Sequence, residues 1–161
     1  MRKSTALLAS ILLILVALAA LFLIGGTLSA RVGSVTASAS EHPQAFESIQ
    51  RVLAAGAEPQ RFGEGLSGNA ADYRLEDVTI RLSNRGLMAA EWLYVEVEPA
   101  PGDIAVYSVT GEGDSVPARS GGSVNVKLIS RRGVSGERVY HIQYYVYGMK
   151  RTVDVRQAVA S

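Results

Sequence analysis

The chain of 161 residues contains no cysteine. Without cysteine, neither disulfide bonds nor metal sites built from thiolates can stabilise the fold. A lipoprotein is excluded as well, because no thiol is present for acylation. A folded domain in this chain must therefore depend on its hydrophobic core, which about 90 strand-rich residues can supply.

The chain also lacks an excess of charge of either sign, since its formal net charge is +1. Residues 1–30 contain Arg2 and Lys3 and no acid, so the remaining chain holds 14 basic and 15 acidic residues. A nearly neutral surface gives no electrostatic reason to bind nucleic acid. We therefore expect no nucleic-acid partner.

Motifs for catalysis, metals and cofactors are missing too. The two histidines, His42 and His141, have no second histidine or carboxylate at a recognised metal spacing. Three acidic residues near turns, Asp103, Glu112 and Asp114, lack the ordered spacing of a calcium loop. The sequence also has no phosphate loop, dinucleotide glycine pattern or nucleophile elbow. We expect a protein that is not an enzyme and that holds no cofactor.

What the sequence does contain is a long apolar run at its start. Residues 6–24 carry no charge, and 13 of these 19 residues are Leu, Ile, Val or Phe. A helix of this length covers about 28 Å, close to the ~30 Å hydrocarbon core of a bilayer. The run predicts one transmembrane helix, a signal-anchor, within residues 1–30. The residues that mark this anchor are Ala6, Leu13, Ala17 and Ile24.

The charges beside the run predict its orientation. Arg2 and Lys3 precede it and Arg31 is the first charge after it. The positive-inside rule then places the N-terminus in the cytoplasm and the C-terminal domain outside the cell membrane. A cleaved signal peptide with a secreted binding domain is the alternative, although residues 28–30 place a bulky Leu28 where a cleavage site favours a small residue.

Small residues form a stripe on this helix. At 100° per residue, Ala6, Ser10, Ala17 and Ala20 fall within about 40° of one direction. Alanine is common in such helices, so we expect a lone anchor. Small residues on one face also let helices approach closely in lipid, so a helix-association face and a homo-oligomer are the alternative.

Residues 31–72 are expected to form a stalk, a short amphipathic helix and a loop. Residues 31–40 are small and polar, which is typical of a stalk. In the helix, Ser40 is the expected cap, Pro43 suits the first turn and Gly56 is the expected stop. Its apolar face is expected to pack against the following domain, with the membrane surface as the alternative. The face consists of Phe46, Ile49, Val52 and Leu53.

From residue 72 onward, apolar residues alternate with polar ones. The expected strands are 75–82, 91–97, 104–110, 123–130, 139–147 and 152–155. Short strands without intervening helices favour an all-β, antiparallel, immunoglobulin-like β-sandwich over residues 73–156, with 157–161 as a tail. Gly148-Met149 is predicted to form a two-residue type II′ turn, and Trp92 is expected to pack in the core without a disulfide.

One segment, DVTIRLSNRGLMAAEWLYVEVEP, resembles the opening hairpin of cell-adhesion-related Ig-like domains of bacterial and archaeal surface proteins. The resemblance covers residues 73–156 and implies an extracytoplasmic binding or spacer module without catalytic residues. The matching positions are Asn84, Gly86, Ala89, Ala90, Gly121, Gly122 and the strand 124–128.

Tyrosines gather in the strand 139–147. Tyr145 and Tyr147 are expected to share one face, and Tyr140 and Tyr144 to share the core face. Exposed tyrosines favour interfaces, so Tyr145 and Tyr147 form a candidate binding face, with ordinary cross-strand pairing as the alternative.

The predicted function is structural or interactive. We expect a single-pass, membrane-anchored extracytoplasmic protein whose partners are the lipid bilayer and another envelope protein or surface polymer. A subunit or accessory of a surface filament or of an archaellum-type motor is the alternative, by analogy of layout with the archaellum stator proteins.

Overall fold

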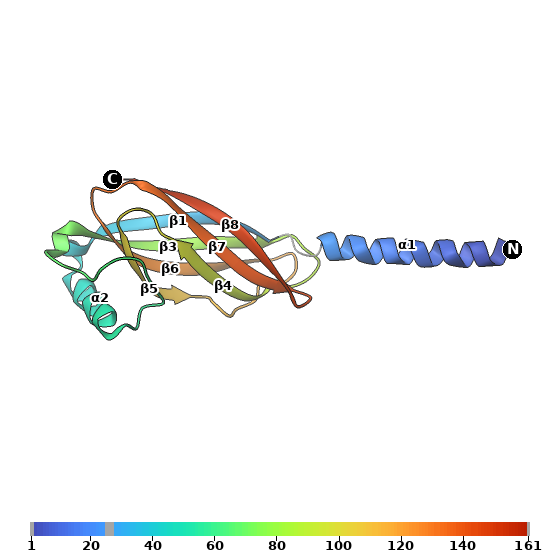
Figure 1. Ribbon diagram of the computed structural model, residues 1–161, viewed down its shortest axis with the longest axis horizontal. Helices are drawn as coiled ribbons and strands as arrows, with labels where there is room; N and C mark the ends of the chain where they lie inside the picture. Colours follow the sequence, from blue (N-terminus) through green and yellow to red (C-terminus); the bar gives the residue numbers. More distant parts are fainter. Residues whose placement is uncertain (1, 25–27, 161) are drawn as a thin grey trace.

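The computed structural model describes residues 2–24 and 28–160, and in the N-terminal helix it describes the side chains of residues 7–20. A helix, α1, precedes eight strands, and a second helix lies between the first two strands (Figure 1). The helices are α1 (Arg2–Ile24) and α2 (Pro43–Ala55), with short 3₁₀ turns at Ala39–Glu41 and Ala70–Asp72. The strands are β1 (Leu28–Ser38), β2 (Gln60–Arg61), β3 (Tyr73–Asn84), β4 (Glu91–Glu98), β5 (Asp103–Thr110), β6 (Gly121–Arg131), β7 (Gly136–Val146) and β8 (Met149–Val159).

The strands form two antiparallel sheets. The first sheet has the order β1-β3-β6-β5-β2 and the second has the order β4-β7-β8. The inner faces of the two sheets meet in one apolar core, as the period-two pattern predicts. The predicted all-β, antiparallel sandwich is therefore confirmed.

Strand alternation decides which side chains enter this core. Tyr140 and Tyr144 of β7 are buried together with Ile142 and Val146, as predicted. On β3, the residues Val78, Ile80 and Leu82 face the same core.

The predicted stalk is wrong, because its residues belong to β1. This strand pairs with β3 over its whole length, from Leu28 opposite Asn84 to Ser38 opposite Arg74. Ala30 and Val32 pack against the core, while Ser29, Arg31 and Gly33 are exposed. Small side chains hid this alternation in the sequence. The other predicted boundaries also move, since β2 interrupts the expected loop and β8 extends through most of the expected tail.

Helix α2 confirms the predicted amphipathic helix and its predicted packing. Phe46, Ile49 and Leu53 are buried against the outer face of the first sheet, in a second apolar cluster with residues of β3, β5 and β6. Gly56 ends the helix in a left-handed conformation, with φ of 63°. The N-cap is His42 rather than Ser40, because a 3₁₀ turn comes first.

The turn between β7 and β8 differs from the prediction. Val146 pairs with Met149, so the two central residues are Tyr147 and Gly148. Both have positive φ, 53° and 71°, which is the geometry of a type I′ turn rather than type II′. Tyr147 therefore lies in the turn and not on the strand face of Tyr145.

Helix α1 projects from one end of the sandwich (Figure 1). Its large apolar side chains between Leu7 and Leu18 are exposed. Among the described residues, no helix combines the length and the hydropathy of a membrane-crossing segment.

Candidate functional site

The sandwich has two unlike ends, and pairing shows which loops share each one. At the end that α1 adjoins, Leu28 pairs with Asn84, Ser83 pairs with Gly121 and Ala90 bridges to Val116. The β7–β8 turn lies at the same end, because Glu91 pairs with Tyr145. We call this region the α1-end surface. It comprises residues 28–31, 81–92, 111–120 and 145–151.

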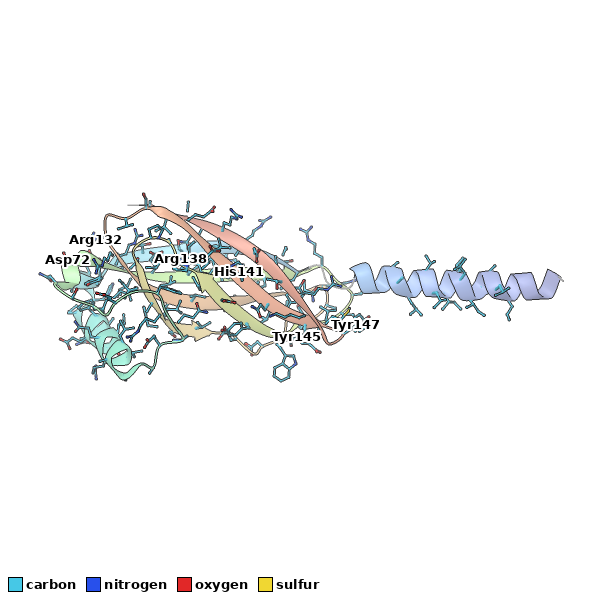
Figure 2. All side chains as sticks on the ribbon, viewed as in Figure 1. Asp72, Arg132, Arg138, His141, Tyr145 and Tyr147 are labelled. Atoms are coloured by element: carbon cyan, nitrogen blue, oxygen red, sulfur yellow. The ribbon has the colours of Figure 1, made fainter. Side chains whose placement is uncertain are left out.

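Exposed apolar side chains collect on the α1-end surface. Of the eight large apolar side chains exposed on the sandwich, only Val35 and Tyr94 lie elsewhere. The predicted pair Tyr145 and Tyr147 lies here, at the end of the sandwich from which α1 projects (Figure 2), at 37% and 47% exposure. The other four are Leu87, Met88, Trp92 and Met149.

Trp92 corrects a prediction, because it is 68% exposed instead of packing in the core. Trp92 is in phase with the exposed Tyr94 and out of phase with the buried Leu93, so strand alternation places it on the outer face of β4. A register shift lies between Glu91 and Tyr94, and Trp92 adopts a φ of 55° there. Its side chain instead lines a shallow depression with Tyr145 and Gly148. The alternation of β4 already indicated the outward direction of Trp92, whereas nothing in the sequence indicated the register shift.

Among the described residues, left-handed backbone at positions other than glycine occurs only on this surface. Trp92, Arg119 and Tyr147 are the only residues other than glycine with positive φ in the described chain. A left-handed conformation costs such residues about 1–2 kcal/mol each. Such strain often accompanies a functional constraint, so these three residues are candidates for one.

The α1-end surface also carries unpaired positive charge. It has six basic residues against the three acids Glu91, Glu112 and Asp114. Within the described chain, none of the six forms an ion pair, whereas five of the eight basic residues elsewhere on the sandwich do. The six are Arg31, Arg81, Arg85, Arg119, Lys150 and Arg151.

The opposite end, near α2, contains a buried polar layer that the sequence analysis missed. Arg138 is fully buried and donates to both carboxylate oxygens of Asp103, with 2.7 Å from Nε to Oδ2. It also donates to Glu76, with Nη1 to Oε2 at 3.0 Å. Ser130 and Arg74 hold the other side of Glu76, at 3.0 and 3.1 Å from Oε1. The layer contains two arginines and two carboxylates, so its formal charges cancel.

The alternation of inward and outward residues along each strand could have revealed this layer in the sequence. Arg74 and Glu76 are in phase with Val78 and the other inward residues of β3, and Arg138 is in phase with Tyr140. Alternation alone therefore places all three inside the sandwich. Figure 2 shows Arg138 nearer α2 than Tyr145 and Tyr147.

The surroundings shift the pKa values of the layer. Burial opposes the charge of Glu76, but hydrogen bonds from Arg138 and Ser130 outweigh burial and lower its pKa. Burial likewise opposes the charge of Arg138, yet the hydrogen bonds that it donates to Asp103 and Glu76 raise its pKa. Burial raises the pKa of Tyr140 to about 12. Its hydroxyl therefore stays protonated and donates to Gln157 over 2.6 Å.

A cleft of about 550 Å³ opens between β1 and β8 beside this layer, and Arg74, Glu76 and Gln157 line it. All three already have hydrogen-bond partners in the protein. In the described chain the only buried side-chain oxygen or nitrogen without a partner is Oε2 of Glu58, which does not line the cleft. The polar side chains of the layer therefore bond to one another, as in a structural network, and none of them lacks a partner that a ligand could supply.

His141 lies on the outer face of the second sheet, as expected of a strand-face residue. Its Nδ1 is 2.8 Å from Asp154 and its Nε2 is 3.5 Å from Glu98. The hydrogen bond with Asp154 is the main reason that the pKa of His141 is raised. The part of the chain that the structure describes holds no group of residues suited to a metal ion.

The anchor residues are described in part. Leu13 is 72% exposed, and Ser10 and Ala17 are exposed on the same helix. The side chains of Ala6 and Ile24 lie outside the described residues. The predicted association face of α1 stays a prediction.

Comparisons with known proteins return distant structural similarities. No family model and no curated protein matches the chain. A yeast GGA1 GAE domain is 13% identical, with a TM-score of 0.42, over 63% of this chain and 100% of that chain. The cupredoxin domain of amoB from Nitrosocaldus yellowstonii is 12% identical, with a TM-score of 0.43, over 86% and 90% of the two chains. A FixG-related protein from Vibrio parahaemolyticus is 10% identical, with a TM-score of 0.37, over 80% and 93%. None of these similarities bears on the function of this chain.

Proposed function

We propose that this protein is a single-pass membrane protein that presents an Ig-like β-sandwich outside the membrane as an interaction module. The observation that carries this proposal is the apolar run of residues 6–24, which has no charge and forms most of α1. Its large apolar side chains between Leu7 and Leu18 are exposed instead of packed against the sandwich. Apolar surface of this extent needs a cover, and a bilayer supplies one.

The energy of insertion favours this arrangement. The 13 large aliphatic and aromatic side chains of the run contribute about 4–8 kcal/mol on the insertion scale. No ionised group in the run opposes that gain. Arg2 and Lys3 ahead of the run favour an N-terminus in the cytoplasm and a sandwich on the other side.

The Ig-like assignment has support in the strand order. The sheets β1-β3-β6-β5 and β4-β7-β8 follow the order ABED and CFG of constant-type immunoglobulin domains, with β2 as a short addition. Domains of this architecture serve many functions, so fold alone does not identify the partner. We propose another envelope protein or a surface polymer.

An interaction role fits the polar chemistry of the chain better than an enzymatic one. The buried charges of Arg138, Asp103 and Glu76 are paired with each other. His141, the one histidine with carboxylate neighbours, lies on an open strand face. A catalytic site needs a pocket with convergent polar groups that are available to a substrate. The cleft beside the layer is lined by Arg74, Glu76 and Gln157, but these groups are already hydrogen-bonded within the protein.

The absence of native cysteine allows a direct test of topology in the full chain. Leu13→Cys and Gln44→Cys would be treated in intact cells with a membrane-impermeant maleimide. We expect labelling at position 44, on the exposed face of α2, and protection at position 13 until detergent is added. Labelling at both positions, or a mature chain that begins near residue 31, would reject the anchor and favour a secreted domain.

The small-residue face of α1 provides a separate test of assembly. Ala17→Ile and Ala20→Ile alter this face, while Ala19→Ile lies on the opposite side of the helix as a matched control. If α1 associates, the first two changes reduce cross-linked oligomers and the control does not. A large complex that co-purifies from gently solubilised membranes would favour a subunit of a filament or motor.

A further inference from the structure

We propose that the α1-end surface rests on the bilayer, with Trp92 and Tyr147 in the headgroup layer and the basic side chains against anionic lipid phosphates. This inference rests on the proposed insertion of α1. It adds that the sandwich itself is a lipid-binding element and that its orientation on the membrane is fixed.

The connection between α1 and the sandwich is too short for any other placement of this end. Only three residues separate Ile24 of α1 from Leu28 of β1. Four steps between Cα atoms reach at most about 14 Å. The headgroup layer beyond the hydrocarbon core is about 5–8 Å thick. With α1 in the membrane, the end of the sandwich that holds Leu28 must touch or nearly touch the headgroups.

The side chains on this surface are those that the membrane interface favours. Trp and Tyr are enriched at the headgroup level, because their rings are apolar and their N–H and O–H groups are polar. Trp92 and Tyr147 are both exposed here, as are Leu87 and Met88 on the same surface. Trp92 lies on the outward side of β4 and Tyr147 lies in the turn after β7, and both have left-handed backbone. The headgroup layer suits the exposed parts of both rings.

The charges on this surface lack counter-ions within the described chain. Arg31 and Arg81 lie directly opposite each other on neighbouring strands, and like charges in that position repel. Arg85 and Arg119 line one shallow depression together with Ser83 and Ser120. Phosphate groups of lipids would neutralise both pairs, and arginine binds phosphate with two hydrogen bonds at once.

Charge on the rest of the sandwich favours the same orientation. Outside the α1-end surface, the sandwich has twelve acidic residues and eight basic ones. The positive end therefore turns toward an anionic membrane, while the remainder is repelled by it.

Trp92 is the only tryptophan in the chain, so its fluorescence reports the proposed contact directly. The full chain would be placed in lipid nanodiscs that contain lipids brominated near the headgroup. We expect a blue-shifted emission from Trp92 and a loss of roughly half of its intensity or more, as for a ring at headgroup depth. Emission that stays at the value for water, with efficient quenching by aqueous iodide, would overturn the proposal.

A relocated tryptophan provides the matched control. In the double variant Trp92→Tyr and Gln44→Trp, the single tryptophan lies on α2 at the far end of the sandwich, and we expect no quenching by brominated lipid. Maleimide labelling of the Leu13→Cys variant in the same nanodiscs separates the two hypotheses. With position 13 protected and Trp92 unquenched, the anchor stands and the headgroup contact fails. With position 13 labelled, the anchor itself fails.

Lipid charge is tested with brominated phosphatidylglycerol and brominated phosphatidylcholine at equal bromine content. We expect stronger quenching of Trp92 by the anionic lipid. The double variant Arg31→Gln and Arg81→Gln should lower this preference roughly fivefold for each arginine lost. The matched double variant Arg131→Gln and Arg132→Gln, at the far end, should leave it unchanged. Equal quenching by both lipids in the unaltered chain would instead indicate that a protein partner, or no partner, faces the basic residues.

Discussion

Tyr147 occupies a position at which the backbone favours a different residue. It is the first central residue of a type I′ turn and has a φ of 53°. Asparagine is preferred there, because it tolerates the left-handed region better than an aromatic residue does. The strain that Tyr147 imposes is consistent with selection for its side chain at the membrane surface.

We expect Tyr147→Asn to raise the free energy of unfolding by about 0.5–1 kcal/mol, as relief of left-handed strain does. The measurement is thermal unfolding of the full chain in detergent, followed by circular dichroism. Tyr145→Asn, on the regular strand next to the turn, is the control and should not stabilise. A loss of stability in the Tyr147 variant would show that contacts of the ring outweigh the strain.

Glu76 predicts a specific dependence of stability on pH. Its folded pKa lies below the ordinary value of 4.5, because Arg138 and Ser130 hydrogen-bond to the ionised carboxylate. A lowered folded pKa adds stability above the unfolded pKa, and this stability disappears as the pH falls through the folded value. The free energy of unfolding should therefore decline on acidification below about 4.5.

Glu76→Gln should reduce the slope of the unfolding free energy against pH, because the titrating group is removed. The reduction should correspond to roughly one proton fewer taken up on unfolding. The slope comes from unfolding free energies measured at several pH values. Glu64→Gln, in an exposed loop, is the comparison and should keep most of the slope of the unaltered chain. An identical slope in the Glu76 variant would mean that its carboxylate is not held in the ionised form.

At the level of elements, the polar layer joins four strands. Glu76 comes from β3, Asp103 from β5, Ser130 from β6 and Arg138 from β7, so the layer connects the two sheets where the apolar core ends. A buried ion pair is costly to break, because the remaining partner is left as an uncompensated charge. The layer therefore makes the loss of any one of its charges costly, even where the intact pairs add little net stability.

Arg138→Met removes the shared cation and leaves Glu76 and Asp103 buried without it. We expect a loss of about 3–5 kcal/mol in the free energy of unfolding, measured in urea. Arg156→Met breaks an exposed pair with Glu137 on the adjacent strand and should cost about 0–1 kcal/mol. A similar small cost for both variants would show that water reaches the layer.

These elements show why the sequence predicted the fold better than the site. Regular alternation predicted β3 through β8, and a capped amphipathic pattern predicted α2, because local residues determine both. β1 escaped prediction because its small side chains carry a weak pattern. The bulge at Trp92 and the clustering of unpaired arginines escaped it because they depend on how distant strands are aligned, which a local pattern does not contain.

At the level of the whole molecule, the excess of basic residues and most of the exposed apolar side chains lie at the same end of the sandwich. The α1-end surface has six basic residues against three acids, and six of the eight large apolar side chains exposed on the sandwich. A membrane contact at this end would have two explanations. The short connection to α1 could force the contact, or the surface could have an affinity of its own.

A flexible spacer separates these explanations. We expect an insertion of 15 Gly and Ser residues after Gly26 to leave the quenching of Trp92 by anionic brominated lipid largely intact at low salt. The spacer lets the sandwich move about 20 Å from the membrane, so proximity alone would no longer hold it. Intrinsic affinity for phosphates would hold it, and this attraction should weaken at about 1 M salt, where the screening length falls to about 3 Å. If quenching is lost in the spacer variant at low salt, the contact in the native chain results from the short connection, and the arginines contribute no binding.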